Sequence, residues 1–159
     1  MNQLLHVSAS PHIKDRVTTS SIMLDVIIAL IPATLFGIIQ FKINALLIIV
    51  TTITTCVLAE YLYERFMKKT ITIKDLSAVV TGFILALNLP STVPLWLPVI
   101  GGLFAIIVVK QFYGGLGQNF MNPALAARCF LLISFTGRMT NFVFDGMTSS
   151  TPLAILKNG

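Results

Sequence analysis

Charged residues are scarce in this chain of 159 residues: they make up 11% of it, and six residues are acidic. Hydrophobic residues make up 55%. So few charges cannot cover the surface of a water-soluble domain of this length. The composition therefore predicts an integral membrane protein. Its net charge of +5 reflects the loops of such a protein and is poor evidence for a nucleic-acid partner.

Cysteine and histidine are also rare, with two of each. Cys56 and Cys129 lie in separate apolar segments and lack the CxxC spacing of a metal or redox site. His12 has no second metal ligand close to it in sequence. A metal or disulfide role is therefore not expected, and both cysteines are interpreted as ordinary thiols within the membrane.

Long apolar runs dominate the rest of the chain. Residues 1–21 are polar and lack the early apolar core of a secretory signal. Residues 22–41, 45–63 and 94–113 are each about 20 residues long, which is enough for a helix to cross a bilayer. Pro32 lies inside the first run, where a proline is expected to kink a helix.

Two further apolar segments, 75–89 and 123–135, are too short to span and are bounded by proline, glycine or asparagine. Interrupted segments in membrane proteins line cavities and indicate binding sites. The predicted fold is all-α and polytopic, with kinked and half-length transmembrane helices. It divides into a polar cytoplasmic segment (1–21), an incomplete helical domain (22–135) and an outer-face loop (136–159).

Basic residues predict the orientation of the chain. With the N-terminus in the cytoplasm, seven basic residues fall inside and three fall outside, which agrees with the positive-inside rule. The loop at 148–151 then lies on the outer face. The inner set is Lys14, Arg16, Arg65, Lys68, Lys69, Lys74 and Lys110, and the outer set is Lys42, Arg138 and Lys157.

The segment 114–123 is a candidate ligand site. Gly114 and Gly115 would let the backbone approach a planar ligand closely. Asn119 and Asn122 are three residues apart, so their amides could point the same way and contact the edge of a polar heterocycle such as an isoalloxazine. The alternative is a re-entrant turn whose asparagines cap the helix that begins at Pro123.

Three charges fall within or near the apolar runs. Arg128 is isolated in 123–135, where it could compensate a flavin anion or a phosphate, pair with an acid of another subunit, or extend to the membrane surface. Asp25 and Glu60 lie towards the predicted cytoplasmic ends of the first two spans. They could line an ion path, but carboxylates near span ends are more often solvated, and solvation is the favoured interpretation.

A run of small hydroxyl residues follows Asp145. Thr148, Ser149 and Thr151 all suit a Ser/Thr turn beside the aspartate. An exposed hydroxyl in such a loop could also be modified covalently.

Taken together, these segments resemble the RnfD component of the Rnf complex and its relative, the NqrB component of the sodium-pumping NADH:quinone reductase. The similarity runs through the whole chain in order and covers about the first half of a family member, so the chain is expected to be incomplete. The matching pieces are Ser10-Pro11-His12-Ile13, Asp25 through Pro32, Asp75 through Phe83, Leu89-Pro90 through Trp96, Gly114 through Arg128, and Asp145 through Thr151.

The resemblance implies two flavins. In the family, the motif D-G-x-[ST]-G-A-T accepts FMN through a phosphoester on its last threonine, joined by a dedicated flavin transferase. Thr151 would therefore carry covalent FMN, with Asp145 and Thr148 in the recognition motif. Serines stand at 149 and 150 where the family usually has glycine and alanine. The family's non-covalent riboflavin would contact the 114–122 segment through Asn119 and Asn122.

The resemblance also implies an activity and partners. The chain would be part of an ion-translocating ferredoxin:NAD oxidoreductase, in which electron transfer drives Na⁺ or H⁺ across the cytoplasmic membrane of a prokaryote. Its partners would be the other components of the complex, including a second FMN-bearing subunit, the flavin transferase and membrane lipid. The alternative is a broken-helix transporter or channel-like protein without flavin.

Overall fold

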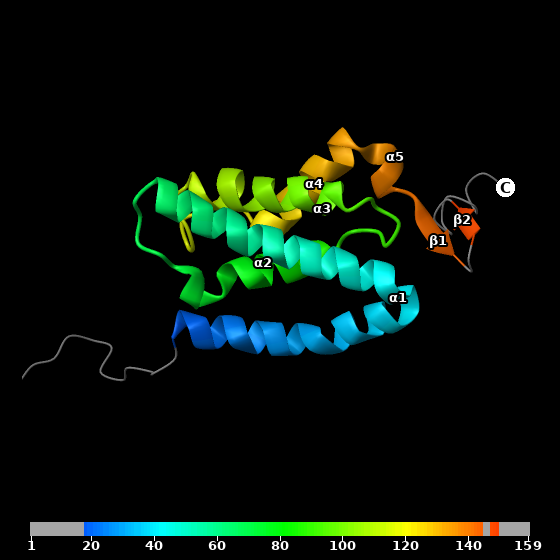
Figure 1. The fold of residues 1–159 in the computed structure, drawn as a ribbon, viewed down its shortest axis with the longest axis horizontal. Coiled ribbons are helices and arrows are strands. Elements are labelled where there is room, and N and C mark those ends of the chain that lie inside the picture. The colour runs from blue at the N-terminus through cyan, green and yellow to red at the C-terminus, as the bar shows by residue number, and fades with distance from the viewer. Residues whose placement is uncertain (1–17, 145–146, 150–159) are drawn as a thin grey trace, which may run out of the picture.

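The computed structural model describes residues 18–144 and 147–149. Helices make up almost all of this part and pack into one elongated bundle (Figure 1). The elements are α1 (Thr19–Phe66), η1 (Ile73–Asp75), α2 (Ser77–Leu87), α3 (Trp96–Leu103), η2 (Phe104–Gln111), α4 (Pro123–Ser134), α5 (Thr136–Met139), β1 (Phe142–Phe144) and β2 (Met147–Ser149).

Helix α1 is folded back on itself as an antiparallel hairpin (Figure 1). Its first turn is capped by Thr18, whose Oγ1 accepts a hydrogen bond from the Ser21 amide at 3.3 Å. Lys42 has φ 55° and ψ −137°, and the chain reverses there. The two arms, 19–41 and 43–66, contain the first two predicted spans. Each is about 35 Å long at ~1.5 Å per residue.

The reversal of α1 falls at Lys42, between the two predicted spans, whereas Pro32, where a kink was expected, does not break the helix. Pro32 lies inside the first arm, and Lys42 is the residue of α1 with non-helical backbone angles. A proline removes one backbone donor, but it does not by itself reverse the chain. The reversal occurs instead where the apolar run gives way to the exposed, charged Lys42.

Within the described residues, α1 is the one helix long and apolar enough to cross a membrane, with a mean hydropathy of 2.5 in its most apolar stretch. Large apolar side chains of its first arm are exposed, among them Phe36 (69%) and Ile39 (77%). A continuous exposed apolar surface of this kind is unsuited to water. The structure therefore agrees with the predicted membrane protein.

The second arm of α1 is packed against the rest of the bundle. Helix α2 lies between the two arms in Figure 1 and approaches the second arm closely at Gly82. A Cβ atom at Gly82 would lie 2.8 Å from the Cα of Ile53, so only glycine permits this separation. The buried core comprises Ile48, Ile49, Leu85, Ala86, Leu89, Val93, Leu97, Ala105, Ala124, Ala127, Leu131 and Met139.

The predicted span 94–113 is divided into two kinds of helix. α3 is α-helical, whereas η2 is a π-helix that ends at Gln111. Together they form a continuous apolar helix from Trp96 to Gln111, shorter than predicted. Wider π turns are rare and are frequent at functional sites.

The end of the described chain forms a small β-hairpin, which the all-α prediction did not include. β1 and β2 are antiparallel, with Val143 opposite Thr148. The β-branched and aromatic sequence of β1 suits a strand. The Thr92 hydroxyl donates to the Asn141 carbonyl at 2.7 Å, which attaches this region to the loop before α3.

Candidate functional site

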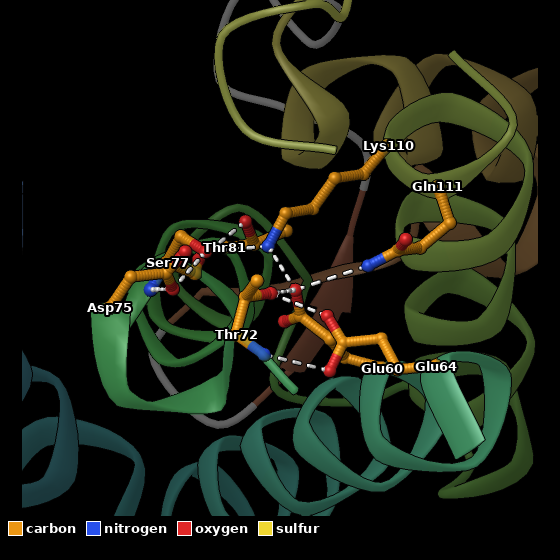
Figure 2. A network of polar contacts seen from close by, with 8 residues as sticks. All are labelled: Glu60, Glu64, Thr72, Asp75, Ser77, Thr81, Lys110 and Gln111. Carbon is orange, nitrogen blue, oxygen red and sulfur yellow. Dashed lines mark hydrogen bonds and ion pairs between the residues drawn. The ribbon is translucent and has the colours of Figure 1, made fainter. Parts of the chain in front are cut away.

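A lysine and a glutamate form a buried ion pair inside the bundle (Figure 2). Lys110 of η2 donates from Nζ to Oε1 of Glu60, on the second arm of α1, at 2.6 Å. The side chains are 2% and 0% exposed. Two opposite charges removed from water in this way must be paired, because either alone would be costly in an apolar environment.

The π-helical backbone brings two consecutive side chains to the same carboxylate. Gln111 donates from Nε2 to Glu60 Oε1 at 3.2 Å, alongside Lys110. Neighbouring residues of a regular α-helix do not face the same partner. Both donors lie at the end of the π-helix η2, and both side chains are long enough to reach Glu60.

The second oxygen of Glu60 is buried, and among the described residues nothing donates a hydrogen bond to it. Close by, Glu64 accepts from the Thr72 amide at 3.0 Å and from the Thr72 hydroxyl. That hydroxyl also lies 3.4 Å from Glu60 Oε1. A hydroxyl has one proton, so Thr72 donates to one of the two carboxylates at a time.

The lysine has a second partner at the start of α2. Lys110 Nζ donates to Ser77 Oγ at 2.5 Å, and Ser77 donates to Asp75 Oδ1 at 2.6 Å. We call the connected set the charge network (Figure 2). Its members are Glu60, Glu64, Thr72, Asp75, Ser77, Lys110 and Gln111.

The charge network holds three carboxyl groups and one ammonium, so one positive charge does not balance it. Carboxylate and hydroxyl oxygens are the ligands that hard cations prefer. The unpartnered Glu60 oxygen, the carboxylate of Glu64 and the Thr72 hydroxyl could therefore hold a small cation or a proton.

The structure corrects one prediction about these residues. Glu60 was expected to be solvated near the end of its span, but it is buried in the bundle, and so is its partner Lys110. Asp25, in contrast, is exposed on the first arm, as predicted. Glu60 and Lys110 are 50 positions apart, so no local spacing relates them. The sequence signal that could have indicated this site is the pair Glu60 and Glu64, one helical turn apart, together with a lysine near the end of an apolar run.

Residues of the charge network line two cavities. The acidic cavity has a volume of about 410 Å³, and Glu64, Asp75 and Gln111 are part of its wall, with Lys69 beside them. The asparagine cavity has a volume of about 150 Å³. Its wall is formed by Met23, Ser77, Val80, Thr81, Ile84, Lys110, Leu116, Asn119, Asn122 and Pro123.

A third cavity borders the asparagine cavity at Asn122. This aromatic cavity has a volume of about 500 Å³ and includes the rings of Phe104, Tyr113 and Phe120 in its wall. Ligand sites for small molecules are typically about 300–1,000 Å³ and mostly apolar. The aromatic cavity is therefore large enough for a planar heterocycle, whereas the asparagine cavity is not large enough by itself.

The predicted asparagine pair lies beside these cavities. Asn122 caps α4: its Oδ1 accepts from the amides of Ala124 (3.0 Å) and Leu125 (3.4 Å), which was the alternative to a ligand role. Asn119 donates to the Met121 carbonyl at 2.7 Å. These hydrogen bonds leave donors of the Asn122 amide for a further contact.

The predicted glycines form the wall of the acidic cavity. Gly114 and Gly115 have φ values of 112° and 100°, which residues other than glycine rarely adopt. Their amides donate to the carbonyls of Gln111 and Lys110, which closes the turn after η2.

Arg128 contacts the end of a half-length helix. Its Nη1 donates to the carbonyl of Asn88, the C-cap of α2, and lies 3.2 Å from Asn88 Oδ1. A cation at a helix C-terminus offsets the negative end of the helix dipole. Arg128 was expected to be isolated, but within the described residues Asn88 is its partner.

Asp145 and Thr151 lie outside the described residues. Thr148 is part of β2, where its backbone pairs with β1.

Comparison with known proteins places the chain in a family. Residues 6–159 match the sequence profile of the NQR2, RnfD, RnfE family. The chain belongs to this family. It is 50% identical to the D component of the Na⁺-translocating ferredoxin:NAD⁺ oxidoreductase complex of Acetobacterium woodii, over 100% of this chain and 52% of that protein.

Two other relatives extend the comparison. The D component of the proton-translocating ferredoxin:NAD⁺ oxidoreductase complex of Clostridium ljungdahlii is 41% identical over 95% of this chain and 47% of that protein. The D component of the ion-translocating oxidoreductase complex of Shewanella denitrificans is 42% identical over 86% of this chain and 40% of that protein. The chain therefore spans about half the length of the curated relatives it matches.

Proposed function

We propose that this chain forms the membrane-embedded N-terminal half of the D component of an ion-translocating ferredoxin:NAD⁺ oxidoreductase complex. The observation that carries the proposal is 50% identity along the whole chain to a protein with that name. The exposed apolar surface of α1 supports a location in the bilayer. The complex would lie in the cytoplasmic membrane of a prokaryote, with the N-terminus of this chain inside.

The proposed function of the chain is electron transfer through two flavins. FMN would be joined through its phosphate to Thr151, with Asp145 and Thr148 in the recognition motif. Riboflavin would bind non-covalently beside Asn119 and Asn122. The flavins supply the redox chemistry, while the protein sets their position and exposure.

The cavities around Asn122 fit such a ring. The aromatic cavity offers rings that can stack on a planar heterocycle, and the Asn122 amide lies at its border with the asparagine cavity. Gly114 and Gly115 follow η2 and lie in the wall of the acidic cavity, which shares Leu116 with the asparagine cavity. Arg128 lies in α4, the helix that Asn122 caps, and would supply positive potential to an anionic flavin.

The same chain would take part in ion transport. The charge network contains a buried carboxylate oxygen without a partner in the described chain and an excess of negative charge, which suits a passing cation or proton. The named relatives include one that translocates Na⁺ and one that translocates protons. We therefore assign ion transport to the complex without choosing between the two ions.

The proposed partners are the other components of the complex, including a second FMN-bearing subunit, together with the flavin transferase and membrane lipid. The exposed apolar faces of α1 and α4 would contact lipid or these proteins.

The test is intact mass and in-gel fluorescence of the denatured protein, co-expressed with its flavin transferase. We expect wild-type protein to fluoresce and to carry the added mass of FMN, and Thr151→Ala to show neither. Ser150→Ala is the matched control, because it removes the neighbouring hydroxyl while leaving the acceptor and the rest of the recognition motif. A colourless wild-type protein would instead favour a transporter without flavin.

A further inference from the structure

Lys110 is the one residue of the charge network that belongs to the wall of the asparagine cavity and also contacts Glu60. Its ammonium group has three donors, and the described contacts, to Glu60 and Ser77, use two of them. The third donor is available to a group in the cavity. The lysine side chain is flexible and carries a compact charge, so a small movement can exchange one partner for another.

Glu60 depends on Lys110 for its balancing charge. The other donors at its Oε1, Gln111 and Thr72, are neutral, and its Oε2 has no donor within the described residues. If the ammonium moves away, the carboxylate needs another positive charge, because an unpaired charge is strongly unfavourable in this environment. Thr72 and Gln111 connect Glu60 to the acidic cavity, from which such a charge could enter.

We propose that Lys110 is a positioning residue that links the two cavities. Negative charge arriving beside Asn122, where the aromatic cavity borders the asparagine cavity, draws the Lys110 ammonium away from Glu60. The freed Glu60 carboxylate then takes up a monovalent cation or a proton from the acidic cavity. When the negative charge leaves, Lys110 returns to Glu60 and displaces the bound cation. The arrangement couples a change of charge beside Asn119 and Asn122 to ion binding at a separate position, and it rests on the proposed electron-transfer function.

Glu60, Glu64, Asp75 and Lys110 are the charged groups of the network, contributed by α1, η1 and η2. Lys69 is the described cation in the wall of the acidic cavity. It is exposed and lies over the ring of Tyr63, 5.1 Å from the ring centre. Lys110 alone reaches both Glu60 and the asparagine cavity.

The test is labelling of Glu60 by a hydrophobic carbodiimide in the assembled complex, read by mass spectrometry of the peptide. Carbodiimides modify a buried carboxyl group when it is not held by a cationic partner. We expect low labelling of the oxidised wild-type complex and several-fold higher labelling after reduction with dithionite. Added Na⁺ should suppress the increase if Na⁺ is the ion that Glu60 takes up, and should leave it unchanged if that ion is a proton.

Variants of Lys110 separate this role from a purely structural one. Lys110→Met should give high labelling in both redox states. Lys110→Arg should give low labelling in both, because a guanidinium can hold the carboxylate through two hydrogen bonds. Lys74→Met, at an exposed position of η1, is the matched control and should behave as wild type.

Equal labelling of oxidised and reduced wild-type complex would overturn the proposal, even if Lys110→Met fails to assemble. The result is read beside the flavin content of the same sample. If flavin is present and reduction does not change the labelling, the link through Lys110 is wrong while the proposed electron transfer stands. If flavin is absent, both fall.

Discussion

At the scale of single residues, the unusual feature is that charge is kept inside an apolar bundle. Packed apolar side chains in place of Glu60 and Lys110 would stabilise the bundle at least as well, because a buried ion pair often contributes little net stability. The π turn of η2 and the unpartnered Glu60 oxygen are further departures from a regular core. Their combination indicates that the pair has a function beyond stability.

Removing one member of the pair should be much worse than removing both. Lys110→Met should lower the free energy of unfolding by about 3–5 kcal/mol, because it leaves the buried Glu60 carboxyl group without its counterion. The double variant Glu60→Gln with Lys110→Met should recover most of that loss. Thermal unfolding of the complex in detergent measures both, with Lys74→Met as the control. A single variant as stable as wild type would show that Glu60 has another counterion.

Asn122 can be tested for its two roles separately. Asn122→Ala should weaken the start of α4 by about 1 kcal/mol, because it removes the acceptor for two backbone amides. Asn122→Asp keeps an acceptor but has no amide donors, so it should unfold like wild type and yet lose non-covalent flavin. Unfolding temperature and flavin extracted by acid report the two effects. Retention of riboflavin by Asn122→Asp would leave the asparagine as a cap only.

At the scale of elements, close packing of α2 on the second arm of α1 holds the charge network together. Ser77 at the start of α2 reaches Lys110, and Gly82 of the same helix lies against Ile53. A displacement of α2 would therefore change the distances at the ion pair.

Two glycines in helices should respond in opposite ways to alanine. Gly82→Ala should destabilise the protein by about 1–3 kcal/mol, because the new methyl group would meet the backbone of Ile53. Gly37→Ala meets nothing within 4 Å and should be stabilising by about 0.5–1 kcal/mol, since alanine favours a helix. Thermal unfolding compares them directly. Equal effects of the two substitutions would contradict the close approach of α2 to α1.

The sequence predicted those elements whose signals are local. Long apolar runs predicted both arms of α1, and Pro123, which directly follows Asn122, predicted the start of α4. The break between the predicted spans 22–41 and 45–63 also predicted the reversal at Lys42. The π turn of η2 was not predicted, because it depends on contacts between distant segments. The ion pair was missed for the same reason: Glu60 and Lys110 each resemble an ordinary charge near the end of a span.

At the scale of the whole molecule, the start of α1 and its reversal lie at opposite ends of the bundle (Figure 1). Ser20 donates to the Lys74 carbonyl at 3.1 Å, so the start of α1 and the segment after its second arm lie together. The reversal at Lys42 lies at the opposite end of the long axis, as does the β-hairpin (Figure 1). The Lys42 turn and the β-hairpin therefore lie at the same end of the bundle.

Cysteine accessibility can determine which side of the membrane the Lys42 turn faces. In a background with Cys56→Ala and Cys129→Ala, Lys42→Cys should react with a membrane-impermeant maleimide in intact cells. Lys68→Cys, at the other end of α1, should react only after the membrane is permeabilised, because the basic residues favour an N-terminus inside. The reverse pattern would put the Lys42 turn and the FMN loop on the cytoplasmic face, so that electrons would not need to cross the bilayer to reach Thr151. Labelling of both positions in intact cells would mean that the cells leak, which a cytoplasmic marker protein detects in the same experiment.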